Sequence, residues 1–158
     1  MVSILVLAIL LGFAVPTFRE FTRNNSVTAA QNDLVTSLNL ARSEALRRSR
    51  PVSVCASADG TTCGAATDWQ TGWIVFTDRG TAGTIDVDDA LIQAWQSPNA
   101  AALVFNTASS FAQYLPTGLR SGGVVTIDIK YTGCVGNRKR RITIRASGAV
   151  DGQLVACP

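Results

Sequence analysis

The chain begins with fifteen residues that carry no charge, MVSILVLAILLGFAV, and these run without a linker into a helical, partly charged segment that ends near Arg50. Only Pro16 and Arg19 mark the end of the apolar run. A helix that crosses the hydrocarbon core of a bilayer needs about 20 apolar residues. We therefore expect the sequence to begin inside a membrane-spanning helix, with a buried core helix as the alternative. A secretory signal peptide is disfavoured, because the run lacks a basic start and an A-x-A-like cleavage site.

The segment after Pro16 has the pattern of an amphipathic helix. Apolar residues recur at steps of three and four and so share one helical face: Val27, Ala30, Leu34, Leu38, Ala41 and Ala45. Pro51 predicts the end of the helix, because the residue before a proline avoids helical dihedrals. We expect one long helix over residues 1–50, with residues 1–18 in lipid or in a helical bundle. Residues 19–50 would then pack on the remainder of the chain.

The remainder, residues 51–158, has the periodicity of strands separated by glycine-rich turns. The runs that predict strands lie at residues 52–55, 73–76, 90–95, 102–105, 124–131, 141–145 and 150–156. No second helical pattern follows Pro51, so the sheets are expected to be antiparallel. The predicted class is α+β, a long N-terminal helix packed on an antiparallel β-sheet head.

The predicted head contains four cysteines: Cys55, Cys63, Cys134 and Cys157. An even number in a small domain behind a membrane segment indicates two disulfides in an oxidising compartment. Three pairings are open, and we favour Cys55–Cys63 with Cys134–Cys157, because a short closed loop and a tethered C-terminus are both easy to form. The alternative is a four-cysteine zinc site, but no spacing is C-x2-4-C and the chain has no histidine.

Charge is distributed unevenly along the head. Residues 56–119 include six aspartates and one arginine, whereas residues 120–145 include seven basic residues and one aspartate. The basic residues that we expect to contact double-stranded DNA, without sequence preference, are Lys130, Arg138, Lys139, Arg140, Arg141 and Arg145, with Arg120 nearby in sequence. Each neutralised phosphate releases a counterion, and the arginine fork fits phosphate oxygens. The alternative is a solvated hairpin that faces acidic lipid headgroups or an acidic partner subunit.

Two further candidate sites have weaker chemical support. Asp78, Asp86, Asp88 and Asp89 offer oxygen ligands for calcium, but no bidentate glutamate follows them, so a solvated turn is favoured. Aromatic residues that would suit a stacking surface for single-stranded nucleic acid are Trp69, Trp73, Phe76, Trp95 and Phe105. Most of these lie in apolar strands and are expected in the core. Trp69 lies outside a predicted strand and is the best candidate for stacking.

The sequence offers no catalytic constellation. Histidine is absent and the cysteines are assigned to disulfides, so the usual pairs of nucleophile and base are missing. We expect a protein that is not an enzyme and that binds no metal or cofactor.

Several stretches match the pattern of one known family. They are A-V-P-x-F at 14–18, N-L-A-R-S-E-A at 39–45 followed by R-P-V, W-x-x-G-W-x-V-F-x-D at 69–78, residues 86–91, Phe111 with P-x-G at 116–118, and the closing stretch 142–148. Together they resemble the GspH/FimT family of minor type IV pilins and pseudopilins over nearly the whole chain. The apolar leader is common to all type IV pilins, whereas the motif at 69–78 beside the helix-end pattern is more specific.

The resemblance implies a pilin-like fold and a minor pilin of FimT or FimU type. Such a subunit is anchored in the inner membrane by a single pass with its head in the periplasm. It then enters the pilus fibre through contacts between its helix and other pilin subunits, with a role in pilus assembly and, for some members, in DNA uptake. The alternative is the GspH-type minor pseudopilin of a type II secretion system. A soluble DNA-binding protein with an apolar terminus is a third hypothesis.

The sequence departs from the family in two places. Members begin with a short basic leader, a cleavage glycine, a phenylalanine and a glutamate, none of which is present. We interpret this as a shortened reading of the gene, with a degenerate family member as the alternative. DNA-binding members of FimT type also carry a G-R-x-R element, and the equivalent stretch here is Gly148-Ala149-Val150-Asp151, which lacks both arginines.

Overall fold

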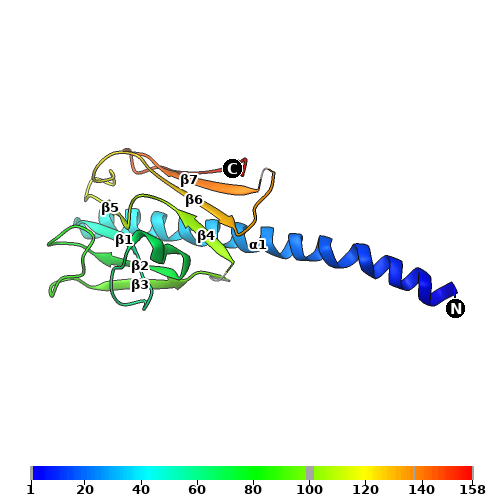
Figure 1. Cartoon of the computed structure of the whole chain (residues 1–158). Helices are drawn as coiled ribbons and strands as arrows, with labels where there is room; N and C mark the ends of the chain where they lie inside the picture. The colour runs from blue at the N-terminus through cyan, green and yellow to red at the C-terminus, as the bar shows by residue number, and fades with distance from the viewer. Residues whose placement is uncertain (1, 99–101, 137, 158) are drawn as a thin grey trace.

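A computed structural model describes residues 2–98, 102–136 and 138–157, with residues 2–20 as backbone only. One helix, α1, spans Val2–Arg48 and projects its N-terminal part, the rod (residues 2–20), beyond the rest of the molecule (Figure 1). It ends where Ser49 takes a positive φ of 51° and the Arg50 amide donates to the Ala45 carbonyl, just before Pro51. Among the described residues, no helix combines the length and the hydropathy that crossing a bilayer requires.

The strands form two antiparallel four-stranded sheets. The first sheet has the order β3-β2-β1-β5, with strands Leu91–Gln96, Gly72–Thr77, Val52–Ala56 and Phe111–Tyr114. The second has the order β4-β6-β7-β8, with strands Leu103–Asn106, Val125–Tyr131, Lys139–Ile144 and Val150–Val155. A short 3₁₀ helix, η1 (Ala66–Gln70), precedes β2. The predicted α+β class with antiparallel sheets is confirmed.

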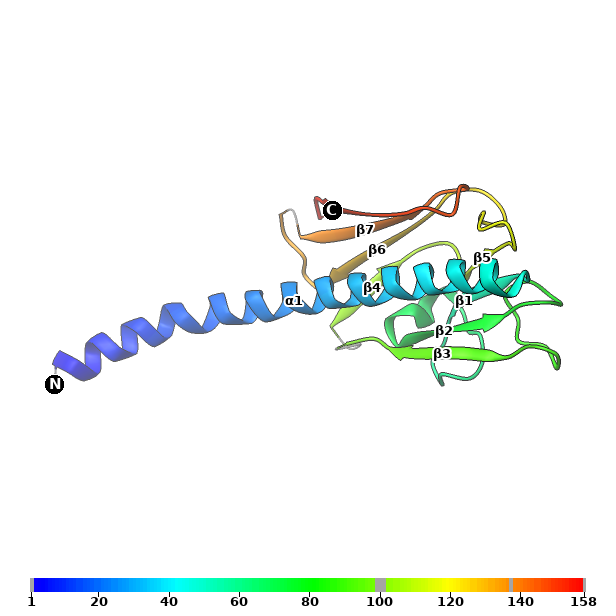
Figure 2. The ribbon, with the colours of Figure 1, turned by 180° about the vertical axis from the view of Figure 1, so that it is seen from behind.

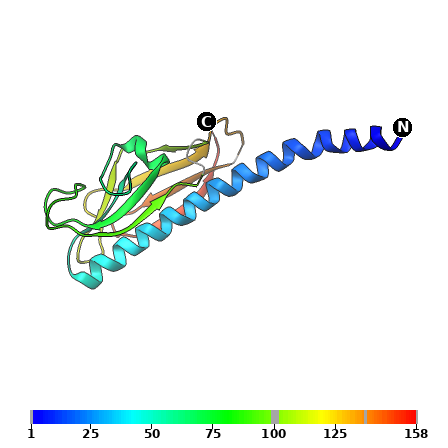
Figure 3. The same cartoon turned by 90° about the horizontal axis from the view of Figure 1, so that it is seen from below.

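The helix packs along both sheets through the face that its sequence pattern predicts (Figure 3). The six predicted positions are all buried: Val27, Ala30, Leu34, Leu38, Ala41 and Ala45. They meet Val52 and Val54 from the first sheet and Ile127, Ile142 and Ile144 from the second in one apolar cluster. Burial of this continuous face is what holds the helix on the head, because helix propensity alone contributes little.

Two turns of the head are attached to the C-terminal part of α1 by one arginine. Arg42 donates from Nε to the Gly118 carbonyl at 3.0 Å and from Nη2 to the Ser147 carbonyl at 3.3 Å. Gly148 sits beside them with φ of 79°, and a Cβ there would overlap the Gly118 carbonyl oxygen. A glycine is therefore needed at this position for both conformational and steric reasons.

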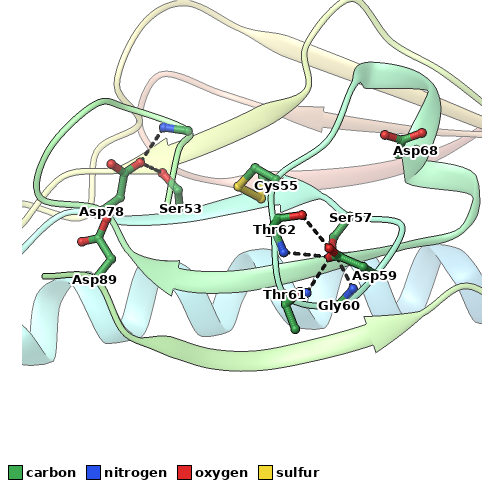
Figure 4. The surroundings of a disulfide bond; sticks show 12 residues. Ser53, Cys55, Ser57, Asp59, Gly60, Thr61, Thr62, Asp68, Asp78 and Asp89 are labelled. Carbon is green, nitrogen blue, oxygen red and sulfur yellow. Dashed lines mark hydrogen bonds between the residues drawn. A yellow bond between two sulfur atoms is a disulfide. The ribbon is translucent and has the colours of Figure 1, made fainter. Parts of the chain in front are cut away.

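The structure forms the two disulfides that the sequence analysis favours. Cys55–Cys63 closes a short loop after β1, and Cys134–Cys157 joins the loop before β7 to the end of the chain after β8. Inside the first loop the Asp59 carboxylate accepts bonds from the Thr62 hydroxyl and from the Thr61 and Thr62 amides (Figure 4). These bonds, that of the Thr62 hydroxyl first, hold the pKa of Asp59 well below its usual range.

Candidate nucleic-acid interface

Three of the six predicted DNA-contacting residues lie on β7, but they do not share one face. Ile142 and Ile144 point into the core, and side chains alternate along a strand, so Arg140 lies on the same inner face. There its Nη2 approaches the Thr28 hydroxyl of α1 at 3.4 Å. Lys139 and Arg141 lie on the outer face of the sheet.

Asp128 pairs with both outer cations. It lies directly opposite Arg141 in the β6–β7 register, and its carboxylate accepts from Arg141 Nε at 2.7 Å and Arg141 Nη2 at 2.9 Å. Lys139 Nζ lies 3.0 Å from the same carboxylate. The hydrogen bonds from Arg141 are the main reason that the pKa of Asp128 is lowered. One buried carboxylate thus engages two of the cations that the sequence offers to phosphate and offsets one of their two charges.

Arg145 is also paired with an acid. Its Nε lies 2.5 Å from the carboxylate of Asp151, which faces Thr143 across the β7–β8 pair. Asp151 occupies the position at which the G-R-x-R element would place its second arginine. Asp151 therefore stands where the motif has a cation, and it also neutralises the neighbouring Arg145.

The remaining cations lie apart from Arg145. Arg138 and Arg140 line a hollow of about 280 Å³ between α1 and the β7–β8 pair, together with Asn24, Val27, Thr28 and Leu154. Seven residue steps separate Arg138 from Arg145, which is about 20 Å along an extended chain. Lys130 is half-buried on β6, opposite Val104 of β4. The structure thus separates the predicted residues into a paired outer group, a distant Arg145–Asp151 pair, the cations at the hollow and Lys130 on β6.

Three of the four acidic candidates have structural roles, and the fourth, Asp88, is exposed. Asp78 is buried and accepts from the Ser53 hydroxyl and the Gly83 amide (Figure 4). Asp86 accepts from the Thr81 amide, and Asp89 from the amides of residues 79 and 86. Within the part of the chain that the structure describes, no group of three or more potential metal-ligating side chains is present. These carboxylates brace the turn between β2 and β3.

The interpretation of Trp69 as a surface stacking residue is wrong. Trp69 lies in η1, is fully buried, and donates from Nε1 to the Ser109 carbonyl at 2.9 Å. Its ring centroid lies 6.4 Å from that of Trp73, which in turn lies 6.1 Å from Phe105. Phe76 is also buried, and Trp95 is half-buried on β3.

Sequence reasoning missed one cation at this end of the head. Arg23 of α1 places its guanidinium 5.5 Å from the centroid of the Tyr131 ring on β6. This cation–π contact joins residues more than a hundred positions apart in the sequence. No local spacing could therefore predict it.

Asp128→Asn tests the ion pairs of β6 and β7. We expect the free energy of unfolding to fall by about 1–2 kcal/mol at pH 7, because partly exposed charge-assisted bonds to Arg141 and Lys139 are lost. A carboxylate with a lowered folded-state pKa stabilises the fold above its unfolded pKa and loses this effect as the pH falls below about 4. Urea unfolding between pH 7 and pH 3 should therefore show that the free energy of unfolding falls more steeply with acid in the wild type than in the variant. Parallel pH profiles would contradict the assignment.

Comparison with known proteins gives one family and a set of similar folds. The family model of the type II transport protein GspH matches residues 30–148. The structure of the type IV minor pilin FimU of Pseudomonas aeruginosa has a TM-score of 0.64 at 22% identity and covers 84% of this chain and 92% of its own. The minor pseudopilin EpsH from the type 2 secretion system of Vibrio cholerae has a TM-score of 0.52 at 16% identity, with 82% and 94% covered. None of the curated protein sequences matches significantly.

Proposed function

The protein belongs to the GspH family, because the model of that family matches most of the chain. We propose that it acts as a minor pilin of a type IV pilus. The observation that carries this proposal is the projecting rod of α1 on a two-sheet head (Figure 1). The similarity to FimU, with a TM-score of 0.64 against 0.52 for EpsH, favours the pilus. The second candidate is a minor pseudopilin of a type II secretion system, which the family description and the likeness to EpsH support.

The rod supports a location in the inner membrane, crossing once with the head in the periplasm. No charged residue precedes Arg19, and the cluster Arg19, Glu20 and Arg23 follows the apolar run, where headgroups would lie. Both disulfides suit an oxidising compartment such as the periplasm. These two features together argue for an anchored subunit whose folded part lies outside the cytoplasm.

Assembly would then exchange one apolar environment for another. The rod leaves lipid and packs against the helices of other pilin subunits, an association driven by close packing because lipid tails are as apolar as the side chains. The head remains outside and presents its loops. This is a structural role, and all four cysteines are bound in disulfides that leave no thiol for chemistry.

Analysis of sheared surface fibres from the native host tests this function. We expect mass spectrometry to find this chain in the fibre fraction together with a major pilin. Recovery with the inner-membrane part of a secretion system, and not with surface fibres, would replace the first candidate by the second. Absence from both assemblies would contradict both.

We further propose that the cations at the hollow, Arg138 and Arg140, form a weak contact site for double-stranded DNA. The hollow lies at an exposed junction of helix and sheet, where both arginines line it together with the polar residues Asn24 and Thr28. Two phosphate contacts give weak binding that falls about tenfold between 50 and 200 mM salt.

A gel shift with the full-length chain in detergent tests the DNA contact at about 50 and 200 mM salt. We expect a shift at the lower salt that Arg138→Ala/Arg140→Ala removes. The matched control is Arg50→Ala/Arg79→Ala, which removes two exposed arginines elsewhere and should leave the shift in place. No shift at the lower salt, or equal loss in both variants, would dispose of this site.

A further inference from the structure

The segments that form the end of the head nearest the rod carry basic residues and no acidic ones. Figures 1 and 2 show α1 just after the rod, the start of β4, the turn between β6 and β7 and the end of β8 together at this end. Aspartate and glutamate are absent from the sequence of these segments, which are residues 21–32, 102–106, 129–140 and 152–157. The same ranges contain five basic residues: Arg23, Lys130, Arg138, Lys139 and Arg140. We call the surface that these segments form the basic end.

The basic end has a fixed place relative to the rod. The Cys134–Cys157 disulfide ties the turn after β6 to the end of β8. The cation–π contact between Arg23 and Tyr131 joins the same turn to α1, close to the point where the rod begins. The hollow between α1 and the β7–β8 pair opens at this junction. A surface that receives the rod therefore also receives the cations of the basic end.

Exposed apolar side chains accompany the cations of the basic end. Phe21 of α1, Val135 of the turn after β6 and Leu154 of β8 are each more than half exposed, and Leu154 lines the hollow. A surface that binds an anionic bilayer combines buried apolar area with cations that attract the headgroups. The DNA backbone offers phosphates but no apolar layer. Lipid therefore accounts for these three side chains, whereas DNA does not.

The distance along α1 places the basic end at the level of lipid headgroups. Phe18 is the last residue of the rod before its first charged residue, Arg19. The helical rise puts Asn24 and Thr28, which line the hollow, about 9 and 15 Å beyond Phe18. The headgroup layer is about 5–7 Å deep on each side of a bilayer. The turn between β6 and β7 reaches further back along α1 than any other described part of the head (Figures 1 and 2), and so closes most of the remaining distance.

We propose that the basic end docks on the anionic phospholipids of the bilayer that holds the rod, with lipid phosphates at Arg138 and Arg140. This rests on the proposed function, because it requires a rod inserted in a membrane and a head outside it. Arginine forks bond phosphate oxygens, and each basic residue near an anionic leaflet raises the docked population about fivefold.

The docked position also controls the proposed contact with DNA. A bilayer against the basic end covers the hollow, so lipid phosphate and DNA phosphate exclude one another at Arg138 and Arg140. The contact with DNA therefore requires that the subunit has left the membrane for the fibre. The anchored subunit keeps its cations occupied until then.

Fluorescence of the full-length chain in lipid nanodiscs tests the docking. A genetically encoded fluorescent amino acid is placed singly at Val135 in the basic end and at Val87, which is exposed in the turn between β2 and β3 at the opposite end of the head (Figure 1). The discs contain phosphatidylcholine alone or mixed with phosphatidylglycerol, and a quencher is attached to some headgroups. We expect quenching at position 135 to be stronger in the mixed discs and to weaken with added salt. Position 87 should stay unquenched in both.

The outcomes separate the docking from the proposed function. No quenching at position 135, or equal quenching in the two lipids, would overturn the docking and leave the anchored subunit standing. A chain that enters neither kind of disc would overturn both.

Charge variants give a second readout in the mixed discs. Arg138→Ala/Arg140→Ala should lower the ratio of docked to undocked heads about 25-fold. Arg138→Lys/Arg140→Lys should keep most of the quenching, because lysine retains the charge. The matched control Arg50→Ala/Arg79→Ala removes two exposed arginines elsewhere and should leave the quenching unchanged.

Thermal unfolding checks that the variants fold, and if the alanine variant does not, the comparison of the two lipids with the wild type decides. Unchanged quenching in a folded alanine variant would overturn the proposal. A gel shift of DNA by the wild type in mixed discs that equals the shift in detergent would also overturn it, because the hollow would then be open while the subunit is anchored.

Discussion

Trp69→Ala is expected to lower the free energy of unfolding by about 3–5 kcal/mol, a large part of the 5–15 kcal/mol that a domain normally has. Trp69 fills the space between η1 and the two sheets, where its ring lies against Trp73. The truncation removes this packing and also leaves the Ser109 carbonyl without its indole donor. Urea unfolding followed by circular dichroism measures the change.

The matched control is Trp95→Ala, which removes the same side chain from a half-buried position on β3. This variant should lose clearly less free energy of unfolding than Trp69→Ala, because less of the Trp95 ring is withdrawn from water on folding. If the two variants lost equal stability, or if Trp69→Ala were neutral, Trp69 would not be the central packing residue that the structure makes it.

Removal of the Cys134–Cys157 disulfide gives the second large effect. The bond spans 23 residues, and the entropy of closing such a loop corresponds to about 3 kcal/mol of stability. The double variant Cys134→Ala/Cys157→Ala should therefore unfold at a lower denaturant concentration than the wild type. The bond also holds the loop before β7, where the Cys157 amide donates to the Gly136 carbonyl at 2.7 Å, so hydrogen exchange in residues 132–136 should rise.

The other disulfide provides the comparison. Cys55–Cys63 spans 8 residues, so Cys55→Ala/Cys63→Ala should cost about 1 kcal/mol less by the same relation. The reverse order of the two losses would show that the short loop, and not the C-terminal tether, limits stability.

The sequence allowed the helix, its buried face and most strands to be predicted, because these depend on local periodicity. Val27 through Ala45 repeat at helical spacing, and all six predicted positions are buried. Two elements were missed. η1 is too short to show a period, and β5, Phe111–Tyr114, is a four-residue strand recognised only through its pairing with β1.

The candidate site was harder to predict, because its charges depend on pairing across strands. Asp128 meets Arg141 only through the β6–β7 register, and Asp151 meets Arg145 only through the β7 hairpin. The inward position of Arg140, in contrast, follows from its even spacing to Ile142 and Ile144 and was readable from sequence.

The central claim is that the rod is enclosed by a membrane or by other helices while the head folds outside the cytoplasm. Membranes from the native host, washed with alkaline carbonate, test it most directly when protease is also added to intact spheroplasts. We predict that the full-length chain stays in the washed membrane pellet and that the external protease removes its head. Release of the whole chain into the carbonate supernatant, or a head protected from the protease, would contradict the account.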